Sequence, residues 1–325
     1  MSKSELPVLA LGLPNLRRAQ WRVDAAGKPS FSLPCLLPLP PETDRRLKGA
    51  AREYWFPVSP DAPPFAEKAA INMCADYDLY SDALYDMSRT ARTDIRIFNH
   101  PDAMARCRIE TMSAILGDIP GLIVPRTLRF KARHLRDFRK VFDETGFKYP
   151  VVLRNGTSIS ERDGVLILSA DHWDRADRLG WWRNGWVTMT QLDTADLAQF
   201  QRLRVCIFGR KMQTLAYQFS YGSTTMASGL NMPEGPDQNN LMRILKTIGA
   251  RIPLDFWTFD LTFKDNGRAQ FEQLWVGLPP RVAQPGKKGQ TMHALMWSQV
   301  GPQLDALLTD PDQWRGYVPP KPVLQ

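Results

Sequence analysis

The chain has 325 residues, which is enough for one large core or for two to three lobes. Of its residues 43% are hydrophobic and 23% are charged, which is the balance of a soluble globular protein. No apolar stretch reaches membrane-spanning length, so we expect no membrane partner. The formal net charge of +8 favours anionic partners such as nucleotide phosphates or an acidic peptide. Lys and Arg are spread along the chain without a nucleic-acid recognition motif, so nucleic acid is an unlikely partner.

The first part of the chain predicts a small parallel α/β unit. Residues 1–65 are rich in proline, which favours extended or turn-rich structure apart from a short helix over 42–53. From residue 68 onward strands and helices alternate, and Asp102 is the expected N-cap of the second helix. We expect strands over 69–74 and 95–98 and helices over 79–92 and 103–116. This order is typical of a parallel sheet.

The remainder of the chain predicts hairpins interrupted by helices. Gly146 ends one helix, and a polar loop over 155–164 separates two strands. The expected strands cover 122–128, 149–154, 165–168, 203–208, 212–219, 256–263 and 268–275. The expected helices cover 132–145, 237–249, 291–297 and 303–308.

Two acidic residues, Asp260 and Glu272, lie on the last predicted hairpin, and its register decides how they are placed. With a two-residue loop (266–267), Leu261 faces Glu272 and Asp260 points to the other side of the sheet. With a three-residue loop (265–267), whose glycine is left-handed, Asp260 lies directly opposite Glu272.

Two carboxylates that face each other across a strand pair repel. A hard cation between them removes this penalty, and Mg²⁺ commonly takes one or two carboxylates together with phosphate oxygens. A surface hairpin with two solvated acids is the competing interpretation, and the hairpin alone favours it.

The succession of segments resembles the ATP-grasp superfamily over roughly residues 68–285. The resemblance lies in 71–76, 99–102 (Asn-His-Pro-Asp), 119–125, 149–154, 190–193, 202–204 and the acidic hairpin. It implies an α/β (α+β lobes) ATP-grasp fold with an N-terminal pre-ATP-grasp α/β domain. The expected domains are a proline-rich segment with that α/β domain (1–98), a first lobe (99–190), a second lobe (191–290) and a helical tail (291–325).

The resemblance implies a phosphate site in the first lobe. Arg154 ends a buried strand, where a phosphate would give it charge-assisted hydrogen bonds. Arg108 is implied as a second phosphate cation. Ser158 and Ser160 lie in the polar loop, whose backbone N–H groups would cradle phosphates. The competing readings are a surface salt bridge for Arg154, a solvated helix residue for Arg108 and a plain turn for the loop.

The resemblance also implies an adenine site and a catalytic pair. Backbone groups at Gln191 and Leu192, with Asp193 beside them, would bind the adenine at the hinge between lobes, although an ordinary edge strand is the alternative. Arg202 and Arg204 alternate along one strand and share a face. A γ-phosphate or acyl phosphate bound there would relieve their repulsion; a solvated face is the alternative.

Asp260 and Glu272 would then hold Mg²⁺, but the sequence departs from the superfamily at the next position. The common ending is Glu-x-Asn, whereas Glu272 is followed by Gln273 and Leu274. We expect Leu274 to share the face of Glu272 without ligating metal. Asn231 and Asn240 are candidate substitutes.

These residues predict a ligase that uses ATP and Mg²⁺. It would activate a small-molecule or peptide carboxylate as an acyl phosphate and join it to an amine or thiol. The alternative is a catalytically impaired, ATP-grasp-like nucleotide-binding or scaffold protein, which Leu274 favours. Four scattered cysteines without a CxxC pair indicate reduced thiols and a cytoplasmic protein. The sequence gives no indication of the oligomeric state.

Overall fold

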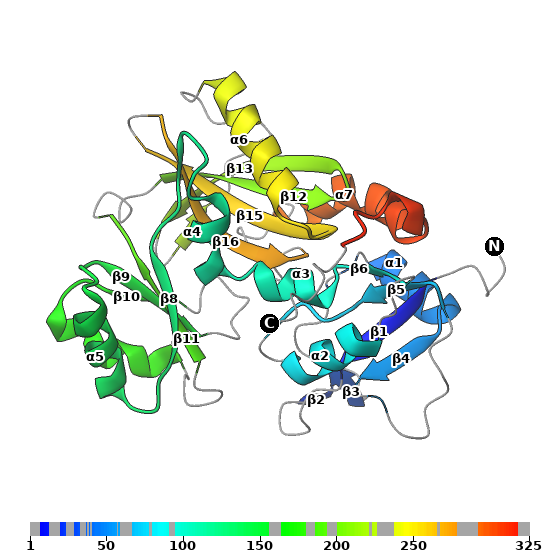
Figure 1. Cartoon of the computed structure of the whole chain (residues 1–325), viewed down its shortest axis with the longest axis horizontal. Coiled ribbons are helices and arrows are strands. Elements are labelled where there is room, and N and C mark those ends of the chain that lie inside the picture. Colours follow the sequence, from blue (N-terminus) through cyan, green and yellow to red (C-terminus); the bar gives the residue numbers. More distant parts are fainter. Residues whose placement is uncertain are drawn as a thin grey trace, which may run out of the picture.

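Three sheets contain most of the strands, and β2 (Gln20–Val23) and β3 (Pro29–Ser32) form a separate hairpin. The computed structural model describes residues 7–12, 20–23, 29–32, 37, 39, 41–56, 58, 67–77, 80–90, 95–155, 164–179, 186–193, 200–220, 223–225, 237–264, 267–277 and 292–317. Figure 1 shows the three sheets in three lobes.

The first sheet is parallel, with the strand order β4-β1-β5-β6, and this confirms the predicted α/β unit. The central strand β1 was not predicted. All five of its residues are buried, as expected for a strand covered on both faces. The elements of this unit are β1 (Val8–Gly12), α1 (Pro41–Ala50), β4 (Glu53–Phe56), β5 (Ala69–Asn72), α2 (Ser81–Thr90) and β6 (Arg96–Phe98).

The prediction of one continuous helix over 103–116 is wrong. The chain forms α3 (Pro101–Arg106), a 3₁₀ turn (Ile109–Thr111) and α4 (Met112–Leu116). The N-cap of α3 is His100 rather than Asp102, because the ring Nδ1 of His100 accepts a hydrogen bond from the Asp102 N–H at 3.1 Å. Pro101 is tolerated at the first helical position because the N–H there needs no partner.

The second sheet is antiparallel, with the strand order β10-β9-β11-β8. Helix α5 and a 3₁₀ segment contribute to the core beneath it. Gly146 ends α5, as predicted, and it has the left-handed conformation. The elements are β8 (Thr127–Lys131), α5 (Leu135–Thr145), β9 (Val151–Asn155), β10 (Gly164–Ile167), the 3₁₀ segment η4 (Ala170–Leu179) and β11 (Trp186–Gln191).

The third sheet has the strand order β14-β13-β12-β15-β16-β7. Helix α6 confirms the helix predicted over 237–249, whereas the two predicted tail helices form one helix, α7, with Pro302 inside it. The elements are β7 (Leu122–Ile123), β12 (Phe200–Phe208), β13 (Lys211–Ser220), β14 (Ser223–Thr225), α6 (Gln238–Arg251), β15 (Phe256–Phe263), β16 (Ala269–Val276), α7 (Met292–Leu308) and the 3₁₀ turn η7 (Pro311–Gln313).

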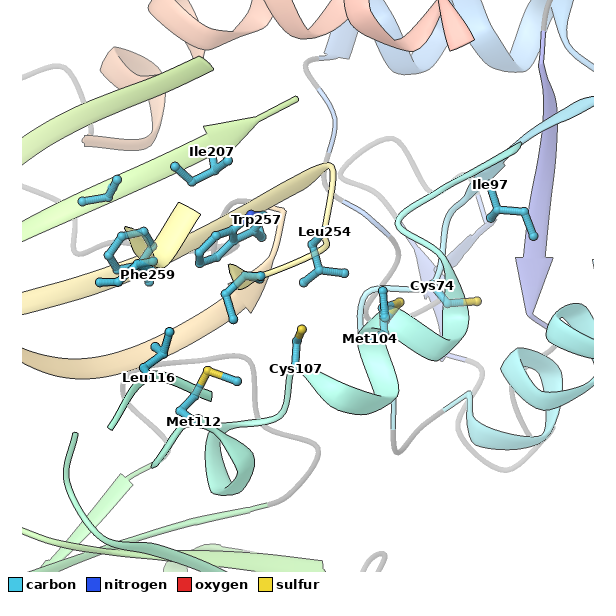
Figure 2. Packing of buried hydrophobic residues seen from close by; sticks show 14 of the residues in the cluster. Cys74, Ile97, Met104, Cys107, Met112, Leu116, Ile207, Leu254, Trp257 and Phe259 are labelled. Atoms are coloured by element: carbon cyan, nitrogen blue, oxygen red, sulfur yellow. The ribbon is translucent and has the colours of Figure 1, made fainter. Parts of the chain in front are cut away.

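One hydrophobic core joins the first and third sheets. Figure 2 shows Met104 and Cys107 between Ile97 of the first sheet and Trp257 of the third. The second sheet has a core of its own around Phe138. The first and third sheets are therefore packed as one body, while the division at residues 98, 190 and 290 stays a prediction. Within the described part of the chain, no helix combines the length and apolarity needed to cross a membrane.

A buried joint fixes the first sheet to the third. Asn99 has a φ of 52° and is fully buried. Its Oδ1 accepts hydrogen bonds from the N–H groups of Asp255 (2.8 Å) and Phe256 (2.9 Å). Its own N–H donates to Asp255 Oδ2 at 2.8 Å. The left-handed conformation is tolerated because several hydrogen bonds determine the position of this asparagine.

Candidate functional site

The second sheet has one apolar face and one polar face. Leu153 and Met189 belong to the core beneath α5. Arg129, Thr188 and Arg154 lie in register across β8, β11 and β9, so they share the opposite face. Figure 1 shows α5 on the outer side of this lobe, away from the other two sheets. The polar face is therefore the one turned toward the rest of the molecule.

Arg154 and Arg108, the two predicted phosphate cations, lie close to Arg129. The Arg129 Nη1 is 3.7 Å from Glu110 Oε1, and the Arg108 Nε is 3.0 Å from the same oxygen. Nε of Arg154 is buried and has no hydrogen-bond partner among the described residues. Arg129 was missed at the sequence level, although the alternation of polar and apolar residues over 127–131 could have indicated it.

The predicted adenine hinge follows β11. Leu192 is buried and Asp193 is exposed. The N–H of Gln191 donates to Arg126 O at 3.0 Å, and the N–H of Leu192 donates to Pro150 O at 2.9 Å. In this conformation these two N–H groups are already engaged. An adenine bound here would therefore form hydrogen bonds with other groups, such as carbonyl oxygens.

Next to the turn, the acidic hairpin has the register that the three-residue loop predicts, with Leu261 opposite Phe271 and Phe263 opposite Ala269. Gly267 has a φ of 75°, as that alternative also predicts. Between Leu261 and Asp260, however, the register of β15 and β16 shifts. Asp260 pairs with Gln273, and Glu272 is the extra residue of a β-bulge. The predicted register, in which Asp260 lies directly opposite Glu272, is therefore wrong.

The two acids nevertheless converge on one buried charge network. Arg204 binds Asp260 with two hydrogen bonds, both of 2.8 Å, in the bidentate geometry. Arg202 lies between the acids, 3.8 Å from Asp260 Oδ2 and 3.5 Å from Glu272 Oε2. Glu272 Oε1 accepts the hydroxyl of Thr262 at 2.8 Å. The side chains of both arginines and both acids are at most 4% exposed, so the solvated hairpin is excluded.

The bulge also corrects the position of Leu274. Leu274 pairs with Phe259 and packs against the core on the α6 side, so it does not share the face of Glu272. Gln273 instead pairs with Asp260 and is buried, which brings its amide to the site. The face predicted to lack a third oxygen ligand therefore has an amide oxygen available from Gln273.

Of four further residues named from the sequence, Asn240 alone has a described position. Ser158, Ser160 and Asn231 lie outside the described residues. Asn240 lies on α6, on the other side of the third sheet, where its Oδ1 accepts a hydrogen bond from Arg243 Nη2 at 2.7 Å.

The donor set of the acidic hairpin fits a hard divalent cation. Asp260 and Glu272 converge on the Arg202 guanidinium, so the site already accommodates positive charge. Gln273 adds an amide oxygen, a ligand type that hard cations accept. No group of three or more His, Cys, Asp or Glu side chains suited to a metal is found among the residues with described positions. Two carboxylates suffice for Mg²⁺ when phosphate oxygens complete its coordination.

Comparisons with solved structures define the fold. D-alanyl-alanine synthetase A from Vibrio cholerae matches with a TM-score of 0.50 at 12% identity, over 77% of this chain and 77% of that chain. The D-cycloserine synthetase DcsG matches with a TM-score of 0.51 at 12% identity, over 84% of this chain and 92% of that chain. No protein-family model and no curated protein sequence matches the chain. The chain has the ATP-grasp fold, as the order of its segments predicted.

Proposed function

We propose that this protein is an ATP-dependent ligase that joins a carboxylate to an amine or a thiol. One observation carries the proposal: the bulge in β16 places Glu272 and Gln273 beside Asp260, on the same face as Arg202 and Arg204. Oxygen ligands and guanidinium groups on one buried face are the groups that a triphosphate and its metal require.

The reaction has two steps. A carboxylate oxygen of the substrate attacks the γ-phosphorus of ATP, the bond to the β,γ-bridging oxygen breaks, and ADP leaves with that electron pair. The amine or thiol then attacks the acyl carbon, loses its proton and expels inorganic phosphate. Positioning and charge neutralisation are the main contributions of the protein in such chemistry.

Each cationic group has a role in this scheme. Arg154, with Arg129 in the same row of the second sheet, would bind the phosphates of the nucleotide. Arg202 and Arg204 would neutralise the transferred phosphoryl group and the acyl phosphate. Mg²⁺, held by Asp260 and Glu272 with Gln273, would add charge neutralisation at the phosphates when bound.

A second candidate is a protein that binds the nucleotide without turning it over. It is favoured by the pairing of Asp260 with Arg204 and by the position of Arg202 between the two acids. In this candidate the internal ion pairs persist after the nucleotide binds. The acids then remain engaged by the arginines and hold no metal.

Release of ADP separates the two candidates. Wild-type protein is incubated with ATP, Mg²⁺ and pools of carboxylates with amines or thiols, and nucleotide binding is measured in parallel by calorimetry. We expect ADP release that falls by about 10-fold to 100-fold in Gln273→Leu, because an oxygen close to the metal is lost. Leu274→Met is the matched control, and its ADP release should equal that of the wild type, because this side chain packs on the α6 side.

The outcomes are distinct. ATP binding without ADP release in any pool supports the second candidate. Absence of ATP binding contradicts both. Equal ADP release from Gln273→Leu and the wild type contradicts the assignment of Gln273 and leaves the ligase in place.

A further inference from the structure

A basic cleft of about 560 Å³ lies beside the turn between β12 and β13. Its cationic lining comes from three segments: Arg210 and Lys211 at the turn, Lys246 on α6, and Arg315 after η7. No acidic side chain is among the residues that line it. Its volume is in the range of cavities that bind small molecules.

The three outer cations of this cleft lack acidic partners within the described part of the chain. Arg210, Lys211 and Lys246 are exposed, and none has a carboxylate within ion-pair distance among the described residues. Some exposed cations elsewhere do have such partners: Arg46 with Asp305, Arg52 with Glu67, Arg96 with Asp312 and Arg251 with Asp118. Like charges gathered at one cleft repel, and a bound anion relieves this repulsion.

Arg315 makes the wall of the cleft rigid. Its Nε donates to Gly209 O at 2.9 Å, and its Nη1 donates to Ile252 O at 2.7 Å. The N–H of Gly209 in turn donates to Asp255 O at 2.6 Å. Burial lowers the pKa of Arg315, Asp255 opposes this change, and the charge of Arg210 lowers the pKa further. The turn is therefore held in place, with its cations Arg210 and Lys211 lining the same cleft as Arg315.

The cleft is separate from the face that carries the proposed ligase site. Ile207 lines the cleft and belongs to the core on the α6 side of the third sheet. Arg202 and Arg204 alternate with the residues of that side, so they lie on the opposite face of β12. An anion in the cleft would not compete directly with one bound at Arg204.

We propose that this cleft binds a small molecule that has several negative charges, as phosphates or carboxylates, on a partly apolar group. The cations at its rim match the charges. The floor matches the apolar part, because it is formed by Ile207, Met212, Leu245 and Pro253. This inference does not depend on the ligase activity.

The test is calorimetric titration with inorganic pyrophosphate and, separately, with citrate, at constant ionic strength. We expect saturable binding of at least one probe, and the stronger probe identifies phosphate or carboxylate as the preferred group. The double variant Lys211→Gln/Lys246→Gln should weaken it by about 10-fold or more, because charge-assisted contacts are removed. The control Arg139→Gln/Lys140→Gln removes the same charge from exposed positions on α5 and should bind as the wild type does.

A third variant separates the cleft from the proposed nucleotide site. Arg154→Gln should leave citrate and pyrophosphate affinity at the cleft unchanged, and hydrogen exchange should slow over 207–212 and 245–250 when the probe is bound. The proposal is overturned if no probe saturates, if both double variants weaken binding equally, or if only Arg154→Gln weakens it. The last result would assign the anion to the nucleotide site.

Discussion

The β12–β13 hairpin carries two pairs of cations in opposite circumstances. Arg202 and Arg204 lie within β12, and their side chains are 2% and 1% exposed. Both face the acids of the acidic hairpin. Arg210 and Lys211, at the turn of the same hairpin, are exposed and line a cleft without an acid among its lining residues. Strand β12 therefore contributes to a neutralised charge cluster along its length and ends beside a basic cleft whose lining residues include no acid.

The difference shows how each region would meet an anion. At the inner pair, a triphosphate must exchange with Asp260 and Glu272 as partners of the arginines, and a metal can take over the released acids. At the turn no exchange is needed, so binding there depends mainly on attraction that salt screens. Nucleotide binding at the inner pair should depend on divalent metal, and anion binding at the cleft on ionic strength.

The largest expected effect is the loss of stability on removing an inner arginine. Arg204→Met leaves the fully buried Asp260 without its bidentate partner. Breaking a buried pair in this way costs about 3–5 kcal/mol of unfolding free energy. Urea denaturation followed by circular dichroism measures the change.

The matched control is Arg210→Met at the exposed turn. It should change the unfolding free energy by less than about 0.5 kcal/mol, as surface substitutions usually do. Equal effects of the two substitutions would contradict the contrast between a paired inner region and an open outer one.

A smaller effect concerns metal. Because Arg202 already supplies positive charge between Asp260 and Glu272, the wild type should take up Mn²⁺ strongly only when ATP is present. Arg202→Met leaves those carboxylates less neutralised and should bind Mn²⁺ without ATP about 10-fold more tightly than the wild type, which is roughly 1.4 kcal/mol. Electron paramagnetic resonance of free Mn²⁺ measures the uptake.

The comparison of the wild type with and without ATP needs no variant, so it stands even if Arg202→Met is poorly folded. Arg210→Met, outside the acidic network, should have the Mn²⁺ affinity of the wild type. Strong uptake of Mn²⁺ by the wild type alone would show that Arg202 does not occupy the place of the metal.

The sequence predicted the acidic hairpin but not its bulge. The turn residues and the aromatic strands were sufficient to identify the hairpin and to offer the three-residue loop. The shift after Leu261 places both Phe271 and Leu274 in the core beneath α6, and that preference depends on packing between distant elements. Local alternation alone therefore assigned Leu274 to the face that Gln273 occupies.

Long-range contacts also explain what the Asn99 segment does. The motif at 99–102 contributed to the resemblance, but its first residue is a structural joint to Asp255 and Phe256, more than 150 positions later in the chain. The strand β1 was missed for a related reason. Its apolar residues are too few to separate a buried strand from other apolar runs until the neighbouring parallel strands are known.

The smallest expected effect is a pH dependence of the unfolding free energy that arises from His100, close to the basic cleft. Burial lowers the pKa of His100 below its ordinary value of 6.5, and the charge of Asp102 opposes this change only in part. The ring of His100 lies 5.1 Å from that of Tyr317, which lines the cleft. As the pH falls through 6.5, the unfolded chain takes up this proton before the folded chain, so the unfolding free energy falls.

His100→Asn tests the assignment, because asparagine can cap α3 in place of the histidine and does not titrate. Its stability should decline less than that of the wild type between neutral pH and pH 5, measured by thermal unfolding. The double variant Lys211→Gln/Lys246→Gln is the control. Its stability should have the same pH dependence as that of the wild type, because neither substitution changes His100. An unchanged slope in His100→Asn would assign the acid sensitivity to other groups.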